Sequence, residues 1–224
     1  MLIRPADRPL SDDEWRSFLA TLDFGQLVAP GRGRDLPVVV PTHFVYAGGD
    51  VALFHLARGN PVGRALDESP RALLTVVGAY TYVDAALNTE PGESPEFGIP
   101  TSYYATVQVA GTCELVDDPA ELAAFLNAQM DHFEPGRDGA PVSVDNEYGK
   151  SLGGIRGVRF HFDDVRAKFK FGGNRTRAHQ AAINATLLAR GTDLDSEAAA
   201  IQLRRLRARP APEPEERHRS RGGE

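Results

Sequence analysis

Residues 36–57 read LPVVVPTHFVYAGGDVALFHLA, and this stretch decides the fold class. Two runs rich in β-branched and aromatic residues, Leu36–Tyr46 and Val51–Ala57, flank the turn Ala47–Asp50, which contains two glycines. Such runs predict strands, and a glycine turn between them predicts a β-hairpin. We therefore expect a sheet of strands joined by hairpins.

The rest of the chain repeats this strand pattern and adds helices around it. Further strands are predicted at Gly25–Ala29, Arg71–Asp84, Ser102–Val116, Ile155–Phe162 and Lys168–Phe171. Helices are predicted after the capping box Ser11–Glu14, from Asn60-Pro61 to about Glu68, from Asp118 to about His132, and at 175–190 and 195–208. The strands do not alternate regularly with helices, which disfavours a doubly wound sheet. The pattern predicts an α+β fold, a closed or partly closed β-barrel with peripheral helices.

The composition is that of a globular chain. The 224 residues are 42% hydrophobic with a net charge of −6, and no apolar run approaches the roughly 20 residues that span a bilayer. One cysteine excludes an internal disulfide framework, and a cytoplasmic location is the expectation. We expect a barrel domain with C-terminal helices over 1–203, followed by a disordered Arg- and Pro-rich tail over 204–224. The acidic remainder of the chain argues against a broad nucleic-acid-binding face.

The segment Leu53–Pro61, LFHLARGNP, combines groups that suit an anionic cofactor. His55 lies on one strand face, Arg58 follows at the strand end, and Asn60 caps the next helix. An imidazole, a guanidinium and a helix N-terminus close together suit a flavin phosphate or haem propionates. His43, on the neighbouring strand, could face the same site. For both histidines the alternative is an ordinary imidazole packed on a half-buried strand.

A second set of polar residues lies near the ends of the later strands. Tyr103 and Tyr104 face opposite sides of one strand, so one phenol points inward as a ligand, proton donor, stacking ring or ordinary core residue. Lys168 and Lys170 line a pocket rim or face solvent. Arg175 opens a helix, where a cation is electrostatically unfavourable unless an anion binds nearby. Peripheral positions are expected for the remaining histidines, which are His132, His161, His179 and His218.

Several of these pieces together resemble a known family. They are Pro41–His43, Phe54–Pro61, Pro100-Thr101 with Tyr104, and Lys168–Lys170 with Asn174-Arg175. Over about residues 2–190 the chain resembles the PaiB-like family, whose members are usually labelled FMN-binding transcriptional regulators. The resemblance implies a split β-barrel, an FMN cofactor and a homodimer.

The chain departs from the common pattern of that family near the expected cofactor. Thr81–Val83 lacks the family's Ser-Pro-aromatic run, Ser102-Tyr103 replaces Trp-Asn, and Gln108 replaces a His. With the long loop 85–101, these changes resemble the piperazate-synthase branch of the family. That branch uses haem b to cyclise N5-hydroxy-L-ornithine to L-piperazate with loss of water.

The resemblance to this branch assigns roles to the candidate residues. It implies that His55 is the axial iron ligand, with His43 as the competing ligand. Further implied roles are propionate binding for Arg58 and Asn60, proton transfer for Tyr103, Tyr104, Lys168 and Lys170, and carboxylate binding for Arg175. Three alternatives stay open: an FMN-binding regulator, a flavin oxidoreductase, and a haem carrier or degrader on the same barrel.

Overall fold

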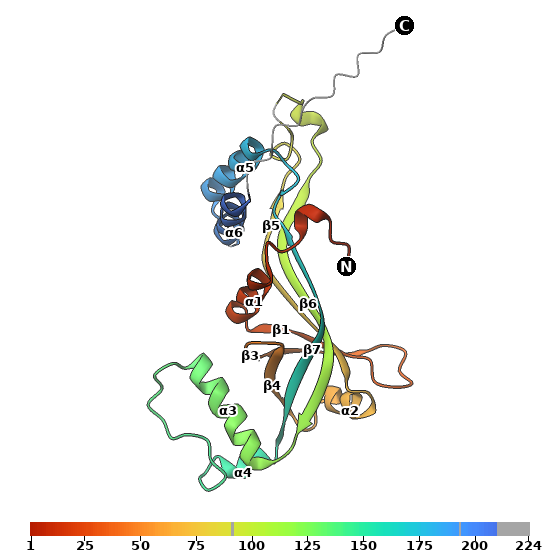
Figure 1. Ribbon diagram of the computed structural model, residues 1–224, viewed down its shortest axis with the longest axis vertical. Coiled ribbons are helices and arrows are strands. Elements are labelled where there is room, and N and C mark those ends of the chain that lie inside the picture. Colours follow the sequence, from red (N-terminus) through yellow and green to blue (C-terminus); the bar gives the residue numbers. More distant parts are fainter. Residues whose placement is uncertain (91, 193, 210–224) are drawn as a thin grey trace.

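The computed structural model describes residues 1–90, 92–192 and 194–209. Its described strands form one seven-stranded antiparallel sheet in the order β2-β1-β5-β6-β7-β4-β3 (Figure 1). The strands are β1 (Phe24–Ala29), β2 (Val38–His43), β3 (Val45–Tyr46), β4 (Val51–Ala57), β5 (Arg71–Val83), β6 (Thr101–Val116) and β7 (Ile155–Lys170). The predicted α+β class is confirmed.

The barrel closes through a single residue. β2 and β3 lie at opposite ends of the strand order, yet only Phe44 separates them in the chain. The Phe44 side chain is fully buried, and its backbone N–H donates to the carbonyl of Asp23 (2.8 Å). The prediction of a single strand over Leu36–Tyr46 is therefore wrong, because the structure has two strands, β2 and β3, in its place. The chain leaves one sheet edge at His43 and joins the opposite edge at Val45.

β7 is one strand of 16 residues, where the sequence predicted two separate runs at Ile155–Phe162 and Lys168–Phe171. The register with β6 shifts midway, so Asp163 bulges out of the ladder. The Asp163 carboxylate then accepts a hydrogen bond from Arg71 on β5. The polar residues that interrupt the apolar alternation are thus a β-bulge and not the end of a strand.

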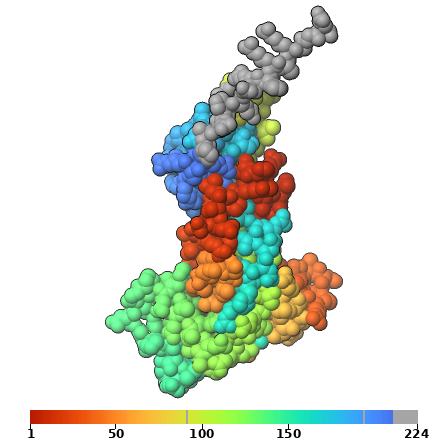
Figure 2. Space-filling view, in the orientation of Figure 1, coloured from red at the N-terminus to blue at the C-terminus, as the bar shows by residue number. Residues whose placement is uncertain are grey.

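The helices in the described ranges are α1 (Asp12–Thr21), α2 (Pro61–Glu68), α3 (Pro119–Phe133), α4 (Gly149–Leu152), α5 (Arg177–Arg190) and α6 (Asp195–Ala208), with single 3₁₀ turns η1 (Pro5–Asp7) and η2 (Pro95–Phe97). Four of these helices lie toward the two ends of an elongated molecule, and α1 and α2 lie between them (Figure 1). α3 and α4 lie at one end of the long strands, and α5 and α6 lie toward the other (Figure 1). The space-filling view shows these ends, green and blue, on opposite sides of the body (Figure 2).

The bounds of the helices bear on membrane crossing and on the expected C-terminal tail. No helix within the described ranges is both long and apolar enough to cross a membrane. Residues 204–208 of the expected tail belong to α6, and the part from residue 210 onward lies outside the described residues.

The core fills the barrel interior with alternate strand residues. Phe54 of β4 and the aromatic side chains of Phe160 and Phe169 of β7 are fully buried or nearly so. α1 covers one opening, where the Phe18 ring packs edge-on against Phe169 at 5.7 Å between centroids. His55, between inward-facing neighbours, stays half-buried on the outer face, as the alternation predicted.

A buried ionic network docks α5 and α6 on β5. The fully buried Asp195 carboxylate accepts hydrogen bonds from Arg190 (2.8 Å and 2.7 Å), from Thr192 (2.6 Å) and from the Thr81 hydroxyl. The Arg190 guanidinium holds the pKa of the Asp195 carboxyl well below its ordinary value. These bonds fix the helix pair beside the end of β5, where β6 begins.

The predicted capping box at the start of α1 does not form. Ser11 makes no side-chain capping bond, and the Glu14 carboxylate instead pairs with the buried Arg205 guanidinium of α6. A charge-assisted hydrogen bond between buried groups is stronger than a local cap bond. The caps predicted at Asn60 and Asp118 are confirmed.

Candidate functional site

The sequence-predicted site residues fall into two groups at opposite ends of β7. His55 pairs with Gly157 near the start of β7, and Tyr104 pairs with Lys170 at its end. Lys170 lies thirteen residue steps along the extended strand from Gly157, which is about 40 Å at ~3.3 Å per residue. One subunit therefore does not bring the two groups into one site.

The first group, here called the histidine end, consists of His43, His55, Gln129 and Phe133. The rings of His43 and His55 face each other edge-on with centroids 5.3 Å apart, and the Phe133 ring lies 5.2 Å from His43. His43 ends β2 and His55 lies on β4, and the contact between their rings confirms that the two histidines face the same place.

Helix α3 orients the imidazole of His55. Nδ1 of His55 lies 2.6 Å from the Oε1 atom of Gln129, a residue that is 4% exposed. Because an amide oxygen only accepts hydrogen bonds, Nδ1 of His55 carries a proton and donates it to Gln129. The Nε2 atom of Gln129 is buried and has no hydrogen-bond partner in the described chain.

The imidazole of His43 favours its neutral form. Burial, followed by the nearby His55, lowers the pKa of His43 below its ordinary value. Neutral imidazole nitrogens are the form that ligates iron. The donor set at the histidine end therefore fits a haem iron.

Arg58 and Asn60 are already engaged within the chain. The Arg58 guanidinium donates to the carbonyl groups of Gly153 (2.8 Å) and Ile155 (3.1 Å) and pairs with the Asp117 carboxylate at 3.0 Å. The Asn60 side chain caps α2. The binding of a propionate by either residue stays a prediction.

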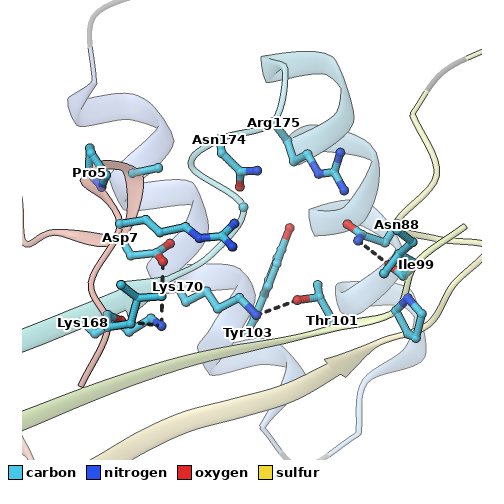
Figure 3. Close-up of a pocket in the computed structure, with 15 residues that line it drawn as sticks. Pro5, Asp7, Asn88, Ile99, Thr101, Tyr103, Lys168, Lys170, Asn174 and Arg175 are labelled. Carbon is cyan, nitrogen blue, oxygen red and sulfur yellow. Dashed lines mark hydrogen bonds and ion pairs between the residues drawn. The ribbon is translucent and has the colours of Figure 1, made fainter.

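The second group lines a cavity of about 620 Å³ at the other end of the strands, here called the cavity end (Figure 3). Three of its walls are the start of β6, the end of β7 and the loop before α5; the N-terminal segment and the loop 85–101 complete it. Its polar lining side chains include Asp7, Asn88, Tyr103, Lys168, Lys170 and Arg175. A volume of this size is typical of small-molecule sites.

The cavity is rich in cations. Lys170 donates to the Thr101 hydroxyl (2.7 Å), and Lys168 donates to the carbonyl of Leu2 (3.0 Å). Arg175 donates to Glu90 (2.9 Å), which stands behind the cavity wall. The cavity thus presents three basic side chains from β7 and the loop that follows it.

Tyr103 brings an unpaired hydroxyl to the same space. The side chain is 1% exposed, and its hydroxyl has no hydrogen-bond partner in the described chain. Burial raises the pKa of Tyr103 to about 12, so the phenol stays protonated. In Figure 3 the hydroxyl points up between Asn174 and Arg175. A buried, unpaired donor in a cavity indicates a ligand that accepts its hydrogen bond.

Tyr104 lies on the opposite strand face, as alternation predicted. Its ring packs against the lysine side chains, with the Nζ atoms of Lys168 and Lys170 at 5.4 Å and 6.0 Å from the ring centroid. It is not part of the cavity lining. Tyr104 therefore contacts the same lysines from outside the cavity.

Sequence reasoning missed two acidic residues and one histidine near the cavity. The peripheral position predicted for His179 is wrong, because its side chain is 2% exposed and its Nδ1 atom lies 3.0 Å from the Glu90 carboxylate. The spacing of His179, Ile183 and Leu187 on one helical face is the signal that could have shown this. No sequence signal marked Asp7 or Glu90.

The comparisons with known proteins agree with this fold. A model of an FMN-binding domain family, FMN_bind_2, matches residues 1–164. The structure is similar to an FAD and haem binding protein from Mycobacterium smegmatis, with 24% identity, 73% of each chain covered and a TM-score of 0.57. It is also similar to the flavocytochrome Anf3 from Azotobacter vinelandii, with 22% identity, 72% of this chain and 68% of that chain covered, and a TM-score of 0.56. No curated protein matches the chain.

Proposed function

The chain belongs to the FMN-binding domain family FMN_bind_2 and has its split-barrel fold, and we propose that it is a haem-dependent cyclase of the piperazate-synthase type. It closes N5-hydroxy-L-ornithine to L-piperazate by forming an N–N bond as water leaves. The observation that carries this proposal is the facing pair of imidazoles, His43 and His55, at the histidine end. Proteins of similar fold that bind haem together with a flavin support it.

His55 would hold the haem iron in this proposal. Its Nδ1 atom is bound by Gln129, which leaves Nε2 as the atom that would bind the iron. The His43 imidazole stands beside it, with the ring centroids 5.3 Å apart. When bound, haem supplies a Lewis acid that polarises the N–O bond of the hydroxylamine.

A reaction that uses both groups of residues requires two copies of the chain, because the ends lie about 40 Å apart along β7. In the proposed two-fold dimer, the histidine end of one subunit meets the cavity end of the other. The neighbouring strands β1, β2 and β5 carry exposed apolar side chains at Phe24, Val39 and Val77, which are 60%, 51% and 65% exposed. An apolar surface of this kind is typical of a protein interface, and we assign it to the homodimer.

Within the cavity, this chain's own residues bind the substrate and move protons. Arg175 and Lys170 provide cations for the carboxylate. The Tyr103 hydroxyl, protonated because its pKa is about 12, donates to the departing oxygen. Lys168 and Tyr104 complete the set of candidates for proton transfer. The N–N bond forms as the N–O bond breaks, so the overall reaction needs no external oxidant or reductant.

The test is product formation by purified protein in three states: without cofactor, loaded with haem, and loaded with FMN. The proposal predicts L-piperazate from N5-hydroxy-L-ornithine only in the haem-loaded state, detected by mass spectrometry. A protein that takes up haem with a Soret band but yields no L-piperazate would contradict the cyclase assignment.

The second candidate is a flavin oxidoreductase or FMN-binding regulator. The basic side chains of the cavity end suit the phosphate of FMN, and the family match supports that cofactor. This candidate predicts stoichiometric FMN binding with absorption typical of flavins, and no Soret band after haem is supplied. The same three preparations therefore separate the two candidates.

A further inference from the structure

The Glu90 carboxylate stands between two basic side chains behind the cavity wall. Its Oε1 atom accepts a hydrogen bond from Nη1 of Arg175 at 2.9 Å, and its Oε2 atom lies 3.0 Å from Nδ1 of His179. Arg175 lines the cavity, whereas Glu90 and His179 do not. One carboxylate is thus shared between a guanidinium that a ligand in the cavity reaches and an imidazole that it does not reach.

The start of α5 holds both basic groups in place. The Thr176 side chain caps the helix by accepting a hydrogen bond from the backbone N–H of His179 (3.2 Å), and the Gln180 side chain donates to the Arg175 carbonyl (2.8 Å). Glu90 comes instead from the loop between β5 and β6, and its side chain is 27% exposed. A movement of the Glu90 carboxylate between its two neighbours therefore requires no change in α5.

His179 is the incompletely bonded member of this trio. Its side chain is 2% exposed, yet neither ring nitrogen has a hydrogen-bond partner of good geometry within the described chain. Buried polar groups are normally hydrogen-bonded, and an unpaired one is costly. The structure therefore shows the Glu90 carboxylate bonded to Arg175, with His179 close enough to take it over.

The electrostatics of the trio favour one anion at a time on Arg175. Burial raises the pKa of the Glu90 carboxyl, but the His179 imidazole and the Arg175 guanidinium beside it hold the pKa below its ordinary value. A ligand anion on Arg175 would meet the negative charge of Glu90 at close range, and like charges disfavour each other. A protonated imidazole offers Glu90 another cation, and imidazoles gain their charge between about pH 5 and 8.

We propose that Glu90 and His179 form a proton-dependent switch that sets the affinity of Arg175 for anionic ligands. When an anion binds to Arg175, the Glu90 carboxylate moves to His179, and the imidazole takes up one proton from solvent as this ion pair forms. At higher pH the imidazole stays neutral, and Glu90 remains on Arg175 as an internal competitor. The switch goes beyond the proposed reaction, because it applies to a carboxylate and to a phosphate alike.

The other titratable groups around this site belong to classes that ordinarily titrate below pH 5 or above pH 9. Burial raises the pKa of Tyr103 further, to about 12. These groups are Arg4 and Asp7 from the N-terminal segment, Tyr103 from β6, Lys168 and Lys170 from β7, Arg177 at the start of α5, and Arg209 after α6, which donates to the Gly173 carbonyl (3.0 Å). His179 is thus the imidazole that makes anion binding depend on pH.

Sulfate is the probe, because it keeps its charge between pH 6 and pH 8. Calorimetry at constant ionic strength gives its Kd for the full-length protein at both pH values. We expect the wild-type protein to bind sulfate about three- to fivefold more tightly at pH 6 than at pH 8, which is the effect of one partly exposed ion pair. Arg175→Ala should weaken binding at pH 6 and abolish the difference.

Two substitutions should act in opposite directions. Glu90→Gln removes the competitor, so sulfate should bind at both pH values as tightly as it binds to the wild-type protein at pH 6. His179→Phe removes the alternative partner, so sulfate should bind at both pH values as weakly as it binds to the wild-type protein at pH 8. The double variant should bind like Glu90→Gln. A general loss of structure would instead weaken binding in every variant.

The matched controls are Glu114→Gln and His161→Phe, from a similar trio on β6 and β7. There the Glu114 carboxylate pairs with Arg159 at 2.8 Å and lies 3.4 Å from Nε2 of His161, outside the cavity. Both controls should keep the wild-type Kd at each pH.

Four results would overturn the switch. They are no sulfate binding, binding that Arg175→Ala leaves unchanged, an equal Kd at the two pH values in the wild-type protein, and a pH difference that survives in Glu90→Gln. These comparisons decide the matter even if His179→Phe does not fold. Because the probe is sulfate and no L-piperazate is measured, the switch and the cyclase stand or fall separately.

Discussion

The histidine end and the cavity end lie at opposite ends of β7 and differ in which polar groups are paired within the chain. At the histidine end, the His55 imidazole is bound by Gln129, whose own Nε2 atom has no partner in the described chain. At the cavity end, Arg175 pairs with Glu90 at 2.9 Å, whereas the Tyr103 hydroxyl has no partner among the described residues. An imidazole oriented beforehand suits a resident cofactor, whereas an unpaired buried phenol in a cavity suits a ligand that binds and leaves.

The largest expected effect concerns the structural support of the cavity end. Asp195→Ala leaves Arg190 without its buried partner, so we expect the free energy of unfolding to fall by about 3–5 kcal/mol in denaturant titrations. The helix pair α5–α6 should loosen while the histidine end, at the other end of β7, keeps its haem affinity. Equal losses of haem affinity and of ligand binding at the cavity end would contradict the independence of the two ends.

The same carboxylate predicts a pH dependence. The folded-state pKa of Asp195 lies below its unfolded value, so its contribution to stability is full above the ordinary Asp value of about 4 and is lost as the pH falls below it. Unfolding monitored between pH 6 and pH 3 should show a steeper loss of stability for the wild-type protein than for Asp195→Ala. Parallel curves would show that Asp195 does not carry this dependence.

The second effect tests the cofactor at the histidine end. His55→Ala should weaken haem binding at least about a hundredfold, because it removes the axial ligand. Titration followed at the Soret band measures this affinity. His161→Ala, on the exposed face of β7, is the control and should bind haem like the wild-type protein. Unchanged haem binding in His55→Ala would show that His55 is not the iron ligand.

The third effect isolates the orienting role of α3. Gln129→Leu removes the acceptor for the His55 Nδ1 proton, and haem affinity should fall about tenfold. Met130→Leu, one residue along the helix and volume-conserving, should have no effect on haem binding. Nitrogen chemical shifts of His55 should show the Nδ1-protonated form in the wild-type protein and a tautomer mixture in Gln129→Leu. An identical tautomer in both proteins would exclude this role.

The smallest effect concerns the unpaired hydroxyl of the cavity. Tyr103→Phe removes a buried donor without a partner, so the free energy of unfolding should rise by about 1 kcal/mol while kcat falls. Tyr148→Phe is the control, because Tyr148 is exposed and lies outside the cavity lining. A loss of stability in Tyr103→Phe would show that the hydroxyl has a partner in the ligand-free protein.

Local patterns in the sequence predicted the strands and most helices, because alternation and capping act within a few residues. Barrel closure at Phe44 depends on a contact with Asp23, which no local pattern contains. The bulge at Asp163 caused the larger error in the prediction of the site. Because β7 was interpreted as two short strands, the continuous strand from Gly157 to Lys170 was not recognised, and neither was the distance between the two ends of the molecule.

The site residues show the same division between local and distant information. Tyr103, Lys168, Lys170 and Arg175 were selected from sequence and do meet in one cavity. Asp7 reaches that cavity only through the path of the N-terminal segment, and a single Asp near a chain end carries no pattern that indicates a site. Its position depends on contacts with Lys168 and Arg209 that are remote in sequence.

Subunit complementation tests most directly the central claim that both ends serve one reaction across a dimer. His55→Ala and Arg175→Ala each remove one end, and each alone should be inactive in L-piperazate formation. When the two variants are unfolded, mixed and refolded together, random pairing leaves one intact composite site in half of the dimers. We therefore predict recovery of about a quarter of the wild-type activity. A refolded mixture as inactive as either variant, beside an active refolded wild-type protein, would contradict the account.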